Sequence, residues 1–149
     1  MSGINLIMRH LKLTSIIYML IAILIIVYVG WVVSFEINLG RNQPMGGNSI
    51  VIATYNSEND RHERVLSVRE VDGKYYIAAN HWPRAWYRQA IANPNVEVKM
   101  AGEERFGNYS AVPLMGEEDQ LLRERYNLSF RSRAQMGFPP RYFLRLDPR

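Results

Sequence analysis

The sequence predicts one membrane-spanning helix followed by a mainly β domain with six strands and two or three helices. Three observations support this prediction. Residues 13–33 contain no formally charged side chain. Several segments between residues 50 and 146 alternate apolar with polar side chains, which is the period of a half-buried strand. Residues 83–93 instead repeat their apolar side chains at the helical period.

Residues 13–33 form the predicted transmembrane helix. About 20 apolar residues cross a hydrocarbon core of roughly 30 Å. Tyr28 and Trp31 lie near one end of the run, as in an interfacial aromatic belt. A cleaved signal peptide is the alternative, but its apolar region usually has only about 7–15 residues. We therefore expect the chain to be held in a lipid bilayer.

The charges that flank this helix predict its orientation. Residues 1–12 form a basic N-terminal tip with Arg9 and Lys12, whereas Glu36 and Arg41 follow the helix. The positive-inside rule then favours a cytoplasmic N-terminus. We expect a single-pass protein of the bacterial inner (cytoplasmic) membrane with a periplasmic soluble domain.

The soluble domain is predicted to occupy residues 50–149. Residues 34–49 are predicted to be a linker, because they combine glycine, proline and four asparagine or glutamine residues. Asp72-Gly73 predicts a type I′ hairpin turn, since both residues accept a positive φ. The predicted strands cover residues 50–55, 64–71, 74–79, 96–100, 105–114 and 141–146.

Two helices are predicted between these strands. Pro83 suits the first turn of one helix, and Asn93-Pro94 ends it. The second helix covers residues 116–126, and residues 127–140 are expected to be irregular. The predicted apolar faces consist of Trp86, Tyr87, Ala90 and Ile91 in the first helix and Leu121, Leu122 and Tyr126 in the second.

The composition excludes several classes of function. The absence of cysteine excludes disulfides, thiolate zinc sites and cysteine nucleophiles. The net charge is +4, and it falls to +2 outside residues 1–33, which is not the charge of a nucleic-acid-binding domain. With three histidines and no cysteine we expect no metal site. No Ser-His-Asp or paired-carboxylate pattern supports a hydrolase.

A motif around the first soluble helix resembles a known family. Trp-Pro-x-Ala-Trp-Tyr at residues 82–87, followed by Ala-Asn-Pro-x-Val-x-Val at residues 92–98, is similar to the deazaflavin-dependent nitroreductase family. Gln89-Ala90 stands where that family usually has Asn-Leu. The resemblance implies a six-stranded antiparallel split β-barrel. It also implies coenzyme F-420 (a deazaflavin) or FMN as cofactor.

The first group of cofactor-binding residues implied by the resemblance lies on the loop after the first strand. The family loop reads Thr-x-x-Gly-Arg-Lys-Ser-Gly-x-x-Arg, and here Thr54 and Arg64 match its ends. Residues 57–61 lack both glycines and the Arg-Lys pair, and they add two carboxylates that repel a phosphate. Arg61 and Arg64 remain as a partial phosphate site. The alternative is that both are solvated arginines paired with nearby acids.

The second implied group surrounds the helix that the motif predicts. Aromatic faces and the N–H groups of a helix N-terminus suit a planar ligand that carries a phosphate. The alternative is that the aromatic residues, Trp86 above all, are core anchors. No catalytic residue is assigned. The residues of this group are Asn80, His81, Trp82 and Trp86.

The C-terminal third is the most basic region of the chain. It is either a solvated face or a surface that contacts anionic lipid head groups or an acidic partner. Its arginines are Arg123, Arg125, Arg131, Arg133, Arg141 and Arg145.

Two functional hypotheses follow from the sequence. The first is a membrane-anchored reductase that uses coenzyme F-420 or a flavin and passes a hydride to a quinone-like acceptor. The second is a barrel with a degenerate cofactor loop and no cofactor, which serves as an accessory subunit of a larger inner-membrane complex. The altered loop favours the second hypothesis. A third idea, haem handling, rests on fold analogy alone.

Overall fold

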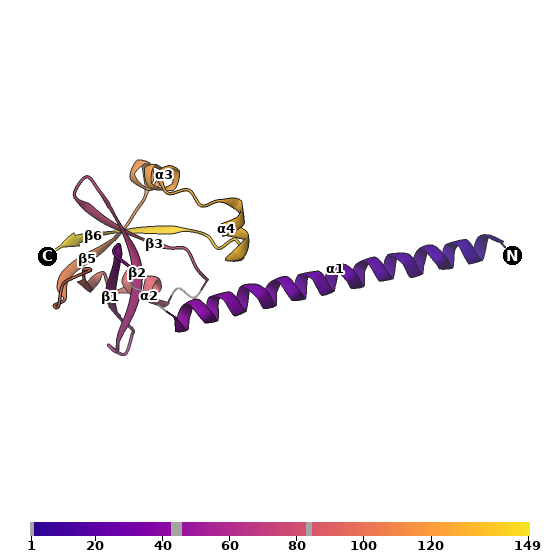
Figure 1. Cartoon of the computed structure of the whole chain (residues 1–149), viewed down its shortest axis with the longest axis horizontal. Coiled ribbons are helices and arrows are strands. Elements are labelled where there is room, and N and C mark those ends of the chain that lie inside the picture. The colour runs from indigo at the N-terminus through magenta and orange to yellow at the C-terminus, as the bar shows by residue number, and fades with distance from the viewer. Residues whose placement is uncertain (1, 43–45, 83–84) are drawn as a thin grey trace.

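A long helix extends from one end of a small β-barrel (Figure 1). The structure is a computed structural model that describes residues 2–42, 46–82 and 85–149, with side chains from residue 12 onward. Its elements are α1 (Ser2–Arg41), β1 (Ser49–Tyr55), β2 (Arg61–Val71), β3 (Lys74–Ala79), α2 (Ala85–Ala92), β4 (Asn95–Lys99), β5 (Gly107–Pro113), α3 (Gly116–Arg125), α4 (Phe130–Gln135) and β6 (Tyr142–Pro148).

The six strands form a closed antiparallel barrel in the order β1-β2-β3-β6-β5-β4. The prediction of a six-stranded antiparallel barrel preceded by an apolar helix is therefore confirmed. The pairing of β1 with β4, which places Ile52 opposite Val98, closes the barrel. Closure gives the strands of this sheet a partner on each side, which protects the barrel from edge-to-edge association. Asp72 (φ 51°) and Gly73 (φ 72°) form the predicted hairpin turn between β2 and β3.

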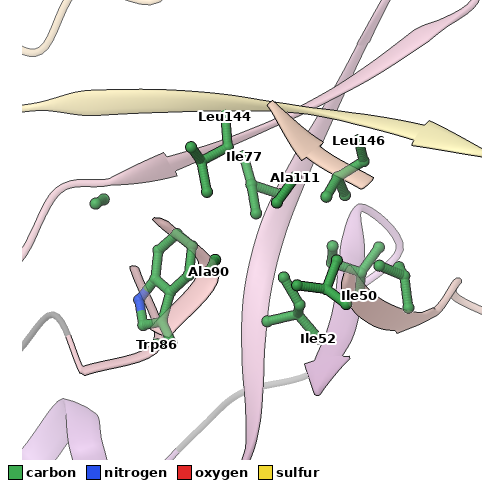
Figure 2. Packing of buried hydrophobic residues seen from close by; sticks show 11 residues of the cluster. Ile50, Ile52, Ile77, Trp86, Ala90, Ala111, Leu144 and Leu146 are labelled. Atoms are coloured by element: carbon green, nitrogen blue, oxygen red, sulfur yellow. The ribbon is translucent and has the colours of Figure 1, made fainter. Parts of the chain in front are cut away.

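The main core lies inside the barrel and is closed by α2. Figure 2 shows Trp86 and Ala90 of α2 directed toward the isoleucine and leucine side chains of the strands. Trp86 is 8% exposed and Ala90 is fully buried, so the predicted apolar face of this helix is correct at these positions. Ile91, predicted on the same face, is 44% exposed, so the prediction is wrong there. A smaller cluster, beside α3, consists of Val71, Tyr76, Leu122 and Phe143.

Helix α1 is longer than the predicted transmembrane segment. It continues to Arg41 and thus includes residues 34–41 of the predicted linker. Residues Lys12–Arg41 are long and apolar enough to cross a membrane by length and composition, a test that a signal sequence also passes. The large apolar side chains between Leu13 and Val27 are exposed along the whole run.

The last turns of α1 pack against the barrel through one face. Tyr28, Val32 and Glu36 follow a spacing of four residues, which places them on the same side of the helix. The Tyr28 hydroxyl donates a hydrogen bond to the carbonyl of Ala134 at 2.8 Å. Val32 is only 8% exposed. These contacts fix the C-terminal end of α1 to the barrel.

Two local expectations differ from the structure. Residues 130–135, predicted to be irregular, form α4, whose N-terminus is capped by the Ser129 hydroxyl accepting from the Ser132 amide. Leu121, expected in the core, is exposed because α3 buries only the narrow face that carries Leu122. The predicted role of Pro83 in the first turn of α2 lies outside the described residues.

Candidate functional site

A pocket of about 170 Å³ lies between the C-terminal end of α1, the β1–β2 pair and the N-terminal turn of α2. It contains four of the seven residues predicted for cofactor binding: Arg64, Asn80, His81 and Trp86. The complete lining is Leu39, Ser49, Arg64, Val65, Leu66, Ser67, Ala79, Asn80, His81 and Trp86.

The strands place the polar side chains of this pocket. Arg64 lies opposite Ile52 in the β1–β2 ladder, and Asn80 follows directly after β3. The Asn80 side-chain carbonyl accepts a hydrogen bond from Arg141 Nε at 2.9 Å. Trp86 lines the pocket and also belongs to the barrel core. Core packing and pocket lining, posed as alternatives from sequence, therefore coexist at Trp86.

Helix α1 contributes directly to this site. Glu36 is 9% exposed, and its Oε1 lies 3.0 Å from Nδ1 of His81. Phe35 also stands beside His81, with ring centroids 6.2 Å apart. Sequence reasoning treated Glu36 only as a charge that flanks the membrane helix. A lone carboxylate one turn beyond an apolar run was the available signal that this residue has a structural partner.

The other three predicted residues do not line the pocket. Thr54 is fully buried and donates a hydrogen bond to Gln89 Oε1 at 2.7 Å, which ties β1 to α2. Trp82 is half-exposed and donates from Nε1 to the carbonyl of Gly137 at 3.2 Å. Arg61 lies at the start of β2, among acidic side chains.

Arg61 has both of its charged partners within the barrel wall. It pairs with Glu63, and its guanidinium lies 2.9 Å from Glu97 Oε2. The hydrogen bond to Glu63 is the largest cause of the raised pKa of Arg61. The Tyr55 hydroxyl and then Arg61 hold the pKa of Glu97 below its ordinary value. The interpretation of Arg61 as an arginine paired with a neighbouring acid fits this geometry.

Four backbone N–H groups of the loop between β1 and β2 donate to acceptors within the loop itself. Asn56 Oδ1 accepts from the amides of Glu58 and Asp60 at 2.9 and 2.8 Å. The Asn59 amide donates to the Asn56 carbonyl at 3.1 Å. An anion-binding nest needs such N–H groups to point at the ligand. The loop therefore does not fit a phosphate.

A more open pocket of about 410 Å³ separates this loop from α2. Tyr55, Asn56 and Ser57 line one side, and Arg88 and Gln89 line the other. The loop and the helix therefore face each other across this pocket. Among the described residues no group of three or more His, Cys, Asp or Glu side chains could hold a metal ion.

A scan against protein-family models gives no match, and a search of curated proteins gives none either. Solved structures, in contrast, share the fold. A protein of unknown function from Agrobacterium tumefaciens superposes with a TM-score of 0.53 at 14% identity, over 68% of this chain and 48% of that chain. This chain thus spans about half the length of that protein. A structure described as a domain-swapped dimer gives 0.51 at 20% identity, over 69% and 82% of the two chains.

An F420-H2 dependent reductase gives a TM-score of 0.48 at 20% identity, over 69% of this chain and 98% of that chain. At identities of 20% or less, the first two structures show a shared fold and no shared function.

Proposed function

We propose that this chain is a membrane-anchored accessory subunit, in which α1 spans the bilayer and the split barrel caps a larger membrane complex without a redox cofactor of its own. The proposal rests on the hydrogen bonds and ion pairs of the β1–β2 loop and the residue that follows it. Its amides donate to Asn56, and Arg61 is paired with Glu63 and Glu97. A phosphate placed there would meet carboxylates instead of free donors.

The pocket beside His81 supports the same proposal. Its volume of about 170 Å³ is below the roughly 300–1,000 Å³ of sites that hold drug-sized ligands. Leu39 of α1 forms one wall, and Glu36 contacts His81 from the same helix. Helix α1 thus forms part of the wall that limits the size of this pocket.

The exposed surface of α1 supports membrane anchoring. A helix that is apolar on all sides is either buried in protein or in lipid. Fully burying one leucine or isoleucine side chain contributes about 1.5–3 kcal/mol. The many exposed side chains from Leu13 to Val27 therefore favour insertion into the hydrocarbon core. The orientation proposed from the flanking charges places the barrel in the periplasm.

A membrane-bound reductase that passes a hydride to a quinone-like acceptor is the second candidate. The convergence of Arg64, Asn80, His81 and Trp86 in one pocket favours it. Purification of the full chain from its native host in mild detergent separates the two functions. A colourless protein that co-purifies with other subunits at a fixed ratio is the expected result. Stoichiometric deazaflavin or flavin absorbance would overturn the accessory role.

The orientation has its own test. The chain has no cysteine, so Asn48→Cys introduces a single thiol at an exposed position just before β1. In intact cells stripped of their outer membrane, a membrane-impermeant thiol reagent is expected to label this variant. Labelling only after the inner membrane is broken would place the barrel in the cytoplasm.

A further inference from the structure

Three arginines gather around a third pocket at the end of the barrel that faces α1. Arg123 of α3, Arg133 of α4 and Arg141, just before β6, line a space of about 440 Å³ together with Pro139 and other residues of the same segment. This pocket is distinct from the one that contains His81, although the hydrogen bond from Arg141 to Asn80 joins the two. None of the predicted cofactor residues lines it.

The positive charge of this arginine cluster is only partly balanced. Asp119 pairs with Arg123, with 2.6 Å between its Oδ2 and Nε. Among the described residues no carboxylate forms an ion pair with Arg133 or Arg141. Burial lowers the pKa of Arg141, and the nearby Arg123 and Arg133 lower it further. Three positive charges around one pocket against one negative charge favour an anionic ligand.

The cluster has the chemistry of a phosphate site. Guanidinium groups bind phosphate through paired charge-assisted hydrogen bonds. Arg141 is held in place because its guanidinium lies 5.0 Å from the ring centre of Phe143 and its Nε donates to Asn80. Arg133 lies 5.7 Å from the ring centre of Phe138. Side chains held in this way lose less freedom when they bind.

The position of α4 identifies the source of the phosphate. Arg133 directly precedes Ala134, whose carbonyl accepts the hydrogen bond from Tyr28 of α1. Tyr28 and Trp31 are the aromatic residues expected at the interfacial belt near the end of the apolar run. Because such a belt lies at the level of the head groups, Arg133 is close to lipid head groups if α1 spans the membrane.

Exposed aromatic side chains surround α4 on the same side. Phe130 is 78% exposed, and its ring lies 5.4 Å from that of Phe138, which is 41% exposed. Trp82 is 50% exposed and bonds to the carbonyl of Gly137. Tryptophan is enriched at the membrane–water interface, and exposed phenylalanine side chains are found on the apolar faces of helices that lie in it. Figure 1 shows α4 on the side of the barrel from which α1 projects.

We propose that the pocket of Arg123, Arg133 and Arg141 binds the phosphate of an anionic phospholipid head group beside α1. This site rests on the membrane-spanning role of α1 proposed above. It gives the barrel a second attachment to the bilayer, beside the anchor α1.

The test uses the full chain in mild detergent, titrated with phosphatidylglycerol or phosphatidylcholine and observed by native mass spectrometry. One phosphatidylglycerol is expected to bind in preference to phosphatidylcholine. Arg133→Gln is expected to weaken that binding roughly tenfold, the effect of losing about 1.4 kcal/mol from a charge-assisted contact. Arg131→Gln is the matched control, because Arg131 lies on the same helix but does not line the pocket.

Three results would overturn the lipid site. They are equal binding of the two lipids, equal losses in Arg133→Gln and Arg131→Gln, and binding of inorganic phosphate that depends on Arg133 without any preference for phosphatidylglycerol. The last result would assign the pocket to a soluble phosphate. Near-UV circular dichroism of each variant confirms that the barrel is folded.

The same preparation distinguishes this inference from the proposed function. Alkaline carbonate releases peripheral proteins from membranes but leaves spanning helices inserted. If the chain resists extraction but shows no lipid preference, the anchoring role stands and only the lipid site is overturned. If the chain is extracted, both proposals are overturned.

Discussion

Oε1 of Glu36 lies 3.0 Å from Nδ1 of His81, and this contact joins the last turns of α1 to the loop that follows β3. The pair brings a carboxylate from a predicted membrane helix to a residue of the pocket wall. Because Glu36 is nearly buried, its carboxylate needs a hydrogen-bond partner within the protein. The orientation of the barrel on its anchor therefore depends on a contact between two residues 45 positions apart.

Removal of this carboxylate is expected to loosen the contact. Glu36→Ala should destabilise the barrel by about 1–2 kcal/mol, because a buried hydrogen-bonded partner of His81 is lost. Glu36→Gln keeps an acceptor oxygen, so it should lower the stability of the barrel by less than Glu36→Ala does. Ile37→Ala, at the exposed neighbouring position, is the control. Thermal unfolding in detergent, followed by near-UV circular dichroism, measures the effect. Equal effects of Glu36→Ala and Ile37→Ala would show that the contact contributes nothing.

Gly137 tests whether α1 is packed tightly on the barrel. Its φ is +73°, and an added Cβ would lie 2.9 Å from Cγ1 of Val32 on α1. Gly116 has a similar φ of +64° but no atom within 4 Å of such a Cβ. Both alanine substitutions incur the left-handed backbone strain of about 1–2 kcal/mol. The free energy of unfolding should fall by about 1–3 kcal/mol more in Gly137→Ala than in Gly116→Ala, because the new Cβ overpacks against Val32.

Val32→Ala provides the matching double-mutant cycle for Gly137. Removal of the two methyl groups of Val32 makes room for the new Cβ, so the extra loss in Gly137→Ala should largely disappear in that background. The thermal midpoints of the parent chain, the two single variants and the double variant, measured in detergent, give the coupling between residues 32 and 137. Purely additive midpoints would mean that α1 does not press on Gly137.

The β1–β2 loop can be tested through its amide protons. The amides of Glu58 and Asp60 donate to Asn56 Oδ1, so they should exchange slowly with solvent deuterium. Asn56→Ala should speed their exchange, because both donors lose their acceptor. Ser57→Ala, within the same loop, should leave their exchange unchanged. Fast exchange of both amides in the unmodified chain would mean that they are free to bind an anion, and it would weaken the accessory-subunit proposal.

A pH-dependent contribution to stability is expected from Glu118. The hydrogen bond from the Tyr76 hydroxyl at 2.7 Å is the largest cause of the lowered pKa of Glu118, and Arg145 lowers it further. A carboxylate with a lowered pKa stabilises the fold above its ordinary pKa of 4.5 and loses this effect as the pH falls through its value in the folded protein. Glu118→Gln should therefore be less stable than the parent chain near neutral pH, by roughly 0.5–1 kcal/mol.

That difference should shrink in acid, below about pH 4.5. Glu117→Gln, at the exposed neighbouring position of α3, serves as control. Thermal midpoints measured across the acid range test the prediction. A difference between Glu118→Gln and the parent chain that stays constant with pH would contradict it.

The sequence predicted the elements well where the pattern was local. The hairpin at Asp72-Gly73 and the end of α2 at Asn93-Pro94 follow from the backbone preferences of those residues. Helix α4 was missed because its six residues show no repeated apolar face, and only the Ser129 cap marks its start. Leu121 was misplaced since periodicity alone did not show how narrow the buried face of α3 is.

By itself, the sequence determined the six strands, the long apolar helix and the altered loop at residues 57–61, because each depends on residues that are neighbours in the chain. Only the tertiary structure decided which residues share a pocket. Barrel closure brings Arg64 near Asn80 and His81, and the docking of α1 adds Glu36. The same folding separates Arg61 and Thr54 from that pocket and gathers Arg123, Arg133 and Arg141 around another. Such contacts join residues distant in the chain, and no local pattern specifies them.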